Sequence, residues 1–268
     1  MDSEIRIPAG AGINAPVLAR PRVAGRGTRC GDCPIADSCS GSTLAALGAS
    51  ATARRVKRGE TLCHADSTYG ALYVVRYGSF KSQVPAADGR QQIIAFPLPG
   101  DVIGLDAIAN DHHHSDTVAL QDSEVCAFAD PERTAPREVQ AKIAAHLRLL
   151  MSREIVEKQR CLAILGTMCS VERVCAFLLE LSSRCLARHW SSSRFLLHMT
   201  RTDIASFLGL QPETVSRALS RMQRRGHLRI EGGRQITITN PEGMRAEFAC
   251  GFESRRAPER MQASAATR

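Results

Sequence analysis

The sequence is poor in aromatic residues and has no long apolar run. Only 4% of its 268 residues are Phe, Trp or Tyr, so we expect cores built from aliphatic side chains. No stretch approaches the roughly 18 apolar residues that a membrane-spanning helix requires. Residues 1–29 lack the apolar segment of a secretory signal. We therefore expect a cytoplasmic protein with no membrane partner.

The motifs of several enzyme and electron-carrier classes are also missing. The sequence has no C-x3-C-x2-C run of the radical-SAM type, no two-cluster ferredoxin run and no nucleotide-binding loop. These absences argue against an iron–sulfur enzyme or electron carrier, which is the main alternative outside DNA binding. We expect a protein without catalytic activity.

Positive charge is concentrated in one part of the chain. Lys and Arg outnumber Asp and Glu by 35 to 27. Between residues 188 and 238 there are nine arginines and only three acidic residues. A basic block of this kind suits a polyanionic partner such as DNA. Charge alone leaves a solvated basic surface equally open.

The pattern of the chain predicts three structured parts between two flexible tails, residues 1–28 and 251–268. Short β-rich runs separated by glycine turns favour a β-sandwich or barrel within residues 29–135. Residues 136–168 are typical of one long amphipathic helix. Residues 169–250 read as helices followed by a β-hairpin.

The long helix carries a stripe typical of a dimer seam. Apolar residues recur at steps of three, four or seven, at Leu147, Met151, Ile155, Leu162 and Leu165. With Lys158 included, the steps from Met151 onward are those of a coiled coil, which indicates a homodimer. Two Lys158 ammonium groups meeting at this seam would repel each other. Alternatively, Lys158 reaches solvent and is neutralised by Glu154 or Glu157.

The last part predicts a helix-turn-helix with a wing. Thr200 is a good N-cap for a first helix, which ends at Gly209 and Leu210. Pro212 starts a second helix, which ends at Gly226. The runs 228–230 and 235–238, joined through two glycines, form the hairpin.

The second helix carries side chains suited to a major groove. Glu213, Ser216 and Arg217 are three and four residues apart and share one face. Arg donates to guanine, Glu accepts from cytosine, and Ser contacts several base edges. Arg221, Arg224 and Arg225 follow as candidate DNA contacts, with Arg224 and Arg225 assigned to phosphates. The alternative is a helical hairpin with a Glu–Arg surface pair.

Three cysteines lie close together near the start of the chain. Cys30, Cys33 and Cys39 have the spacing C-x2-C-x5-C, which fits a metal or cluster loop. The spacing alone leaves zinc and an iron–sulfur cluster open. We expect Cys161, Cys169, Cys175 and Cys185 to pack in cores, and residues 112–114, three histidines, to fill a polar loop. Cys63 and Cys250 stay unassigned.

The sequence resembles the FNR-type oxygen sensors of the CRP/FNR superfamily over residues 29–250. Residues 213–217 resemble the E-T-x-S-R core of the FNR recognition helix, and the order of parts matches. The resemblance implies an α+β fold: a cyclic-nucleotide-binding-like β-roll (jelly roll), a long dimerisation helix and a winged helix-turn-helix. It also implies sites of the TTGAT-N4-ATCAA type, read by Glu213, Ser216 and Arg217. Pro212 replaces the base-reading Arg of CRP-type members.

The resemblance implies a sensory group as well. Cys126 matches the fourth ligand of a [4Fe–4S] cluster completed by the three loop cysteines, and RNA polymerase is an implied partner. A regulator that uses zinc or haem, or senses nitric oxide, is the alternative. Superfamily members that sense cyclic nucleotides hold the phosphate with Glu and Arg. Residues 104–108 and 115–117 contain no Arg, so we expect no cyclic nucleotide here.

Overall fold

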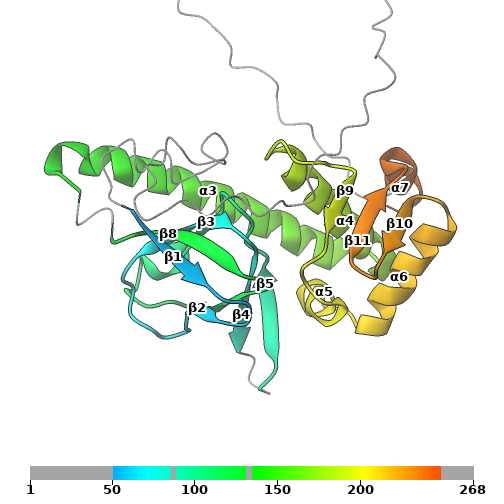
Figure 1. The fold of residues 1–268 in the computed structure, drawn as a ribbon, viewed down its shortest axis with the longest axis horizontal. Helices are drawn as coiled ribbons and strands as arrows, with labels where there is room; N and C mark the ends of the chain where they lie inside the picture. Colours follow the sequence, from blue (N-terminus) through cyan, green and yellow to red (C-terminus); the bar gives the residue numbers. More distant parts are fainter. Residues whose placement is uncertain (1–50, 86–88, 131–134, 249–268) are drawn as a thin grey trace, which may run out of the picture.

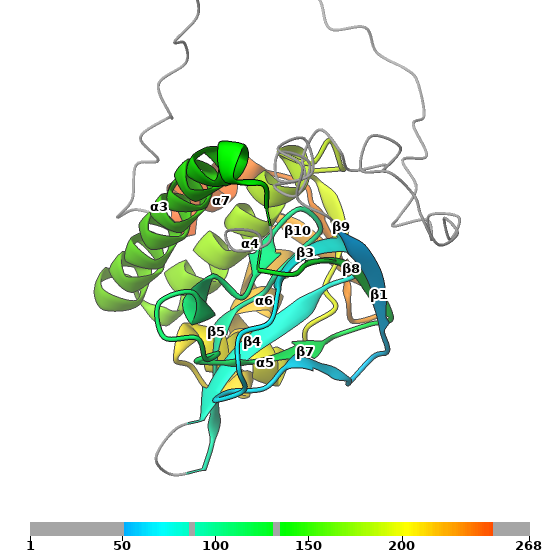
Figure 2. The same ribbon diagram turned by 90° about the vertical axis from the view of Figure 1, so that its left-hand side faces the viewer.

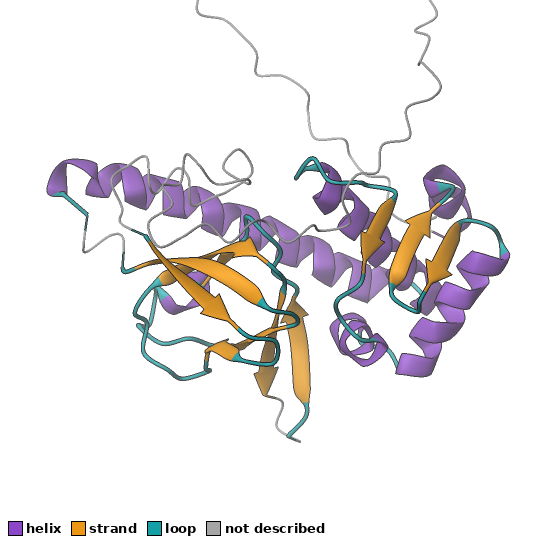
Figure 3. Ribbon diagram, in the orientation of Figure 1, coloured by secondary structure: helices purple, strands orange, loops and turns teal. Residues whose placement is uncertain are grey.

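The computed structural model describes residues 51–85, 89–130 and 135–248. Its first part is a β-roll of two antiparallel sheets, with strand orders β1-β8-β3-β6 and β2-β7-β4-β5. Figure 3 shows this strand-rich part beside a second, mainly helical part. The strands are β1 (Thr52–Val56), β2 (Thr61–Cys63), β3 (Leu72–Tyr77), β4 (Phe80–Pro85), β5 (Gln91–Ala95), β6 (Val102–Ile103), β7 (Asp116–Ala119) and β8 (Ser123–Phe128).

The inside of the β-roll is mainly aliphatic, with Phe80 and Cys63 among its buried residues. Val56, Val75, Phe80 and Val125 are almost fully buried between the two sheets. Alternation along β8 sends Val125 inward, while Cys126 and Phe128 join the packing on the other face. This other face of the β1-β8-β3-β6 sheet is called the outer face below.

The long helix α3 (Arg137–Thr167) covers the outer face. Ile143, Leu147 and Leu150 are buried against Leu72, Val74 and Phe128 of the sheet. Leu147, which precedes the predicted seam that starts at Met151, therefore packs on its own β-roll. Farther along, Ile155 and Leu162 are 57% and 68% exposed. Figures 1 and 2 show α3 running past the β-roll to the helical part.

The helical part has a three-stranded sheet of order β10-β11-β9. The predicted helices and hairpin are present, but β9 and α7 were not predicted. The first helix of this part ends at Leu186, and the first helix of the predicted helix-turn-helix starts at Arg201, directly after its N-cap Thr200. The elements are α4 (Ser170–Leu186), β9 (Arg194–Leu196), α5 (Arg201–Leu208), α6 (Pro212–Arg224), β10 (Leu228–Glu231), β11 (Gln235–Ile238) and α7 (Pro241–Phe248).

The two parts share one hydrophobic core. Ile93 and Phe96 of the β-roll are each only 4% exposed and belong to the same cluster as the core of the helical part. The Phe96 ring centre lies 5.9 Å from that of Phe177 and 5.3 Å from that of Phe207. No helix within the described ranges is long and apolar enough to span a membrane.

Candidate nucleic-acid interface and metal-ligand site

A capping box fixes the start of α5. The Asp203 backbone N–H donates to Thr200 Oγ1 (3.0 Å), and the Thr200 N–H donates to Asp203 Oδ2 (2.8 Å). Gly209 then ends the helix at φ 62°, in the left-handed region that favours glycine. The turn between α5 and α6 therefore follows from local sequence, as predicted.

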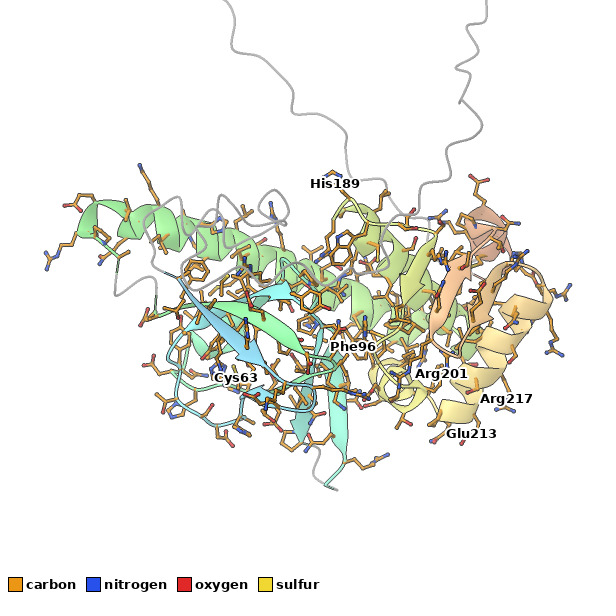
Figure 4. All side chains as sticks on the ribbon, viewed as in Figure 1. Cys63, Phe96, His189, Arg201, Glu213 and Arg217 are labelled. Atoms are coloured by element: carbon orange, nitrogen blue, oxygen red, sulfur yellow. The ribbon has the colours of Figure 1, made fainter. Side chains whose placement is uncertain are left out.

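The sequence of α6 separates a buried face from an exposed one. Val215, Ala218, Leu219 and Met222 are buried. The predicted reading residues all lie on the exposed face, and Figure 4 shows Glu213 and Arg217 at the outer edge of the molecule. The exposed predicted residues are Glu213, Ser216 and Arg217.

Two of these side chains are oriented by their own helix. Ser216 Oγ donates to the Pro212 carbonyl (3.0 Å), and Arg217 Nη2 donates to Thr214 Oγ1 (3.2 Å). Neither bond buries the polar group, so both side chains stay accessible to a ligand. The exposed face therefore offers donors and an acceptor to the edges of base pairs.

The three arginines at the end of α6 differ in their surroundings. Arg221 and Arg224 are exposed. Arg225 Nε lies 3.3 Å from Glu247 Oε1 on α7, and His227 Nε2 lies 2.7 Å from the other carboxylate oxygen. The His227 ring lowers the pKa of Glu247, so the carboxylate is charged beside Arg225. A partner within the chain therefore weakens the assignment of Arg225 to a phosphate.

The wing is attached to the start of α5. Residues 228–231 pair with 235–238, and Gly232 and Gly233 make the turn at positive φ. Arg201 Nη2 donates to the Gly233 carbonyl across 3.0 Å. The exposed Arg229 and Arg234 extend the basic surface beyond α6. The wing was predictable from sequence, but the Arg201 contact was not, because Arg201 and Gly233 are far apart in the chain.

Of the four predicted cluster ligands, only Cys126 falls in the described part. It is half-buried on the outer face, where it packs against the cluster that includes Ile143, Leu147 and Leu150 of α3. Its neighbours across the sheet are Ala53 and Val74. Cys30, Cys33 and Cys39 lie outside the described residues. A half-buried thiol beside an alanine methyl group fits a cluster ligand chemically.

Most other described cysteines are buried or half-buried. Burial raises the pKa of Cys63 and of Cys175 to about 12, and it also raises the pKa of Cys185. In the metal-free chain these three thiols are therefore protonated at neutral pH and unreactive. Cys175 and Cys185 pack in a core as predicted, and Cys161 is half-buried. Cys169 is exposed at the N-cap of α4, so core packing was the wrong prediction there. Cys250 lies outside the described residues.

The histidine loop is bonded within the β-roll. Asp106 accepts from the His114 N–H (2.9 Å) and lies 3.8 Å from Nδ1 of His113, which is 4% exposed. His113 is therefore a core residue, while His112 and His114 are exposed. Within residues 51–85, 89–130 and 135–248, His, Cys, Asp and Glu form no group of three or more suited to a metal ion.

Comparison with known proteins agrees with this architecture. Residues 53–132 match the cyclic nucleotide-binding domain, and residues 172–247 match the Crp-like helix-turn-helix domain. The chain is 42% identical to transcriptional regulatory protein btr of Bordetella pertussis, over 71% of this chain and 78% of that protein. It belongs to the CRP/FNR superfamily of transcription regulators.

Other CRP/FNR-superfamily relatives extend the match. The fumarate and nitrate reduction regulatory protein of Salmonella typhimurium is 34% identical, over 86% of this chain and 94% of that protein. The structure of FixK2 from Bradyrhizobium japonicum has 31% identity and a TM-score of 0.68, over 74% of this chain and 96% of that one. These relatives are regulators and not enzymes, so this superfamily member is a DNA-binding transcription regulator.

Proposed function

We propose that this regulator responds to oxygen or redox state through a [4Fe–4S] cluster held by Cys30, Cys33, Cys39 and Cys126. The observation that carries the proposal is the position of Cys126 on the outer face, against residues that also contact α3. Two kinds of relative have names that agree with a response to oxygen. They are called anaerobic regulatory protein and fumarate and nitrate reduction regulatory protein.

Helix α3 connects the proposed cluster site at Cys126 to the formation of a dimer. Ligation at Cys126 would constrain the outer face of β8, on which the first half of α3 packs. The second half of α3 carries the exposed Ile155 and Leu162, two members of the predicted seam. When bound, the cluster supplies an oxygen-labile centre, and its presence favours closure of the seam between two copies.

The paired copies then present two α6 helices to DNA. Glu213, Ser216 and Arg217 of each copy read one half of a TTGAT-N4-ATCAA-type site, and nearby arginines contact phosphates. A two-fold dimer matches a palindromic site because each half-site meets the same side chains. Bound in this way, the regulator controls anaerobic or microaerobic genes together with RNA polymerase.

The test compares Cys126→Ser with Cys169→Ser after anaerobic purification. Serine is a good N-cap, so Cys169→Ser preserves the start of α4 while also removing one thiol. We expect the parent and Cys169→Ser to contain iron and sulfide, to lose their visible absorption in air, and to bind the site anaerobically. Cys126→Ser should lack the cluster and the binding. Full iron content in Cys126→Ser, or zinc in the parent, would contradict the proposal.

A further inference from the structure

One strand of the β-roll docks on the helix-turn-helix. On β5, the Ile93 N–H donates to Ser206 Oγ of α5 (3.0 Å), and that hydroxyl donates to the Gln91 carbonyl (3.1 Å). The Gln92 amide also donates to the Ser206 carbonyl. A side chain of α5 thus replaces a further strand at this edge of the sheet.

Ion pairs join the same two parts of the chain. Lys81 of β4 lies 2.8 Å from Asp203 of α5, and the two side chains are only 24% and 11% exposed. Arg184 of α4 and Arg188, which follows that helix, both pair with Asp101, which precedes β6. Because these groups are partly shielded from water, their attraction is stronger than that of an exposed pair.

Apolar contacts add to these ion pairs. Phe96, directly after β5, contacts the rings of Phe177 on α4 and Phe207 on α5. Figure 4 shows Phe96 between the two parts. The same strand is tied to α3, because Lys158 Nζ donates to the Ile94 carbonyl (3.1 Å). The dock, defined as these contacts of residues 81 and 91–101, therefore joins α3 to α5.

The dock leaves the reading face of α6 uncovered. Glu213, Ser216 and Arg217 are all exposed while the dock is formed. The contacts therefore do not block DNA. They fix the orientation of α6, through α5, relative to α3, on which the proposed seam lies.

We propose that the dock is the positioning element that sets which spacing between two half-sites this regulator accepts. The inference rests on the proposed dimeric binding to paired half-sites. Each added base pair moves the second half-site by about 3.4 Å and turns it by roughly 35° around the DNA. A rigid dock makes such a shift costly, whereas a loose one lets each α6 follow its own half-site.

The experiment loosens the dock outside the reading face. Lys81→Ala and Ser206→Ala are made singly and together, and Lys57→Ala removes an exposed lysine elsewhere on the β-roll as a charge-matched control. Anaerobically purified proteins are titrated with duplexes whose half-sites are separated by four base pairs, or by one or two fewer or more. A duplex with one half-site is included.

We expect the parent and Lys57→Ala to prefer the four-base-pair spacer by about tenfold or more, as expected for a rigid two-fold reader. In the double variant this preference should fall to roughly threefold, while binding to the single half-site stays within about twofold, because the reading residues are unchanged. An unchanged spacing preference would overturn the inference. So would an equal loss on every duplex, which indicates only a destabilised domain. A parent that binds no paired site better than one half-site would overturn the dimeric function itself.

Discussion

Two arginines of the recognition region show how neighbours decide what a charged residue can do. Arg217 is exposed and donates to Thr214 of its own helix, so its guanidinium can turn toward a base. Arg225 is paired with the charged Glu247, which also faces His227. Identical side chains eight positions apart thus have different access to DNA.

Arg217→Ala should weaken binding to the matched site by about 1–3 kcal/mol and relax the preference at one base pair. Arg224→Ala should weaken binding to all sequences alike and lower the salt slope by about one, because it loses a phosphate contact. Arg225→Ala should have the smaller effect of these two phosphate candidates. Titrations against matched and singly altered half-sites at two salt concentrations measure all three. An equal loss on every sequence for Arg217→Ala would show that it contacts only the backbone.

At the residue scale, the sequence predicted the features that follow from the spacing of residues along a helix. The common face of Glu213, Ser216 and Arg217 follows from their spacing, and the cap at Thr200 follows from Asp203 three residues later. The Arg225–Glu247 pair could not be predicted, because Glu247 lies on a helix that the sequence pattern did not reveal. The exposure of Cys169 was missed because cysteine is usually buried.

At the scale of elements, α5 depends on a residue of another domain. Burial alone would raise the pKa of Asp203, but hydrogen bonds from Lys81 and Thr200 outweigh it and lower the pKa below its ordinary value. A carboxylate whose pKa is depressed in the folded state stabilises the fold above its unfolded-state pKa. That stability is lost as the pH falls through the folded-state value.

Lys81→Met should therefore move acid unfolding to higher pH. Without the ammonium group, the buried Asp203 loses its strongest partner, so its pKa rises and it takes up a proton earlier on acidification. Far-ultraviolet circular dichroism between neutral pH and the ordinary Asp range follows the transition, with Lys57→Met as the control of equal charge. Coincident acid transitions for the two variants would mean that Lys81 does not stabilise the Asp203 carboxylate.

The elements that sequence analysis missed are short or unusual. β9 has three residues, too few for an alternating pattern to be visible. α7 begins at Pro241 and is capped by Asn240, whose side chain accepts from the Gly243 N–H (2.8 Å). An Asn-Pro pair and an internal glycine are more typical of a turn, which hid the helix. The β-roll strands and α3 were predictable because their sequence patterns are regular and are bounded by glycine or proline.

At the scale of the whole molecule, Lys158 has two roles to distinguish. Its ammonium group lies 3.0 Å from Glu154 Oε1, the neutralising partner in one of the two sequence interpretations. It also donates to the Ile94 carbonyl, so it joins α3 to the β-roll of its own chain. From the repulsion expected between two Lys158 ammonium groups at the seam, we hypothesise that this charge keeps the cluster-free protein monomeric, and this stays a prediction.

Under that hypothesis, Lys158→Leu should form dimers without a cluster and bind DNA in air, because the seam then gains an apolar side chain and loses a like-charge contact. Sedimentation of the cluster-free variant is compared with the parent, and Lys142→Leu, an exposed lysine near the start of α3, is the matched control. A Lys158→Leu monomer at concentrations where the cluster-loaded parent is a dimer would overturn the hypothesis.

The shared core around Phe96, Phe177 and Phe207 also bears on how such a protein can change over evolution. Its two parts are not interchangeable modules, because the Phe96 ring of the β-roll packs against the Phe177 and Phe207 rings of the helical part. A chimera joining this DNA-reading part to a foreign β-roll would leave Phe177 and Phe207 without their partner and expose apolar surface. New sensory specificity is therefore easier to reach by substitutions within the existing β-roll than by exchange of whole domains. Such substitutions need compensating changes where the β-roll contacts the helical part.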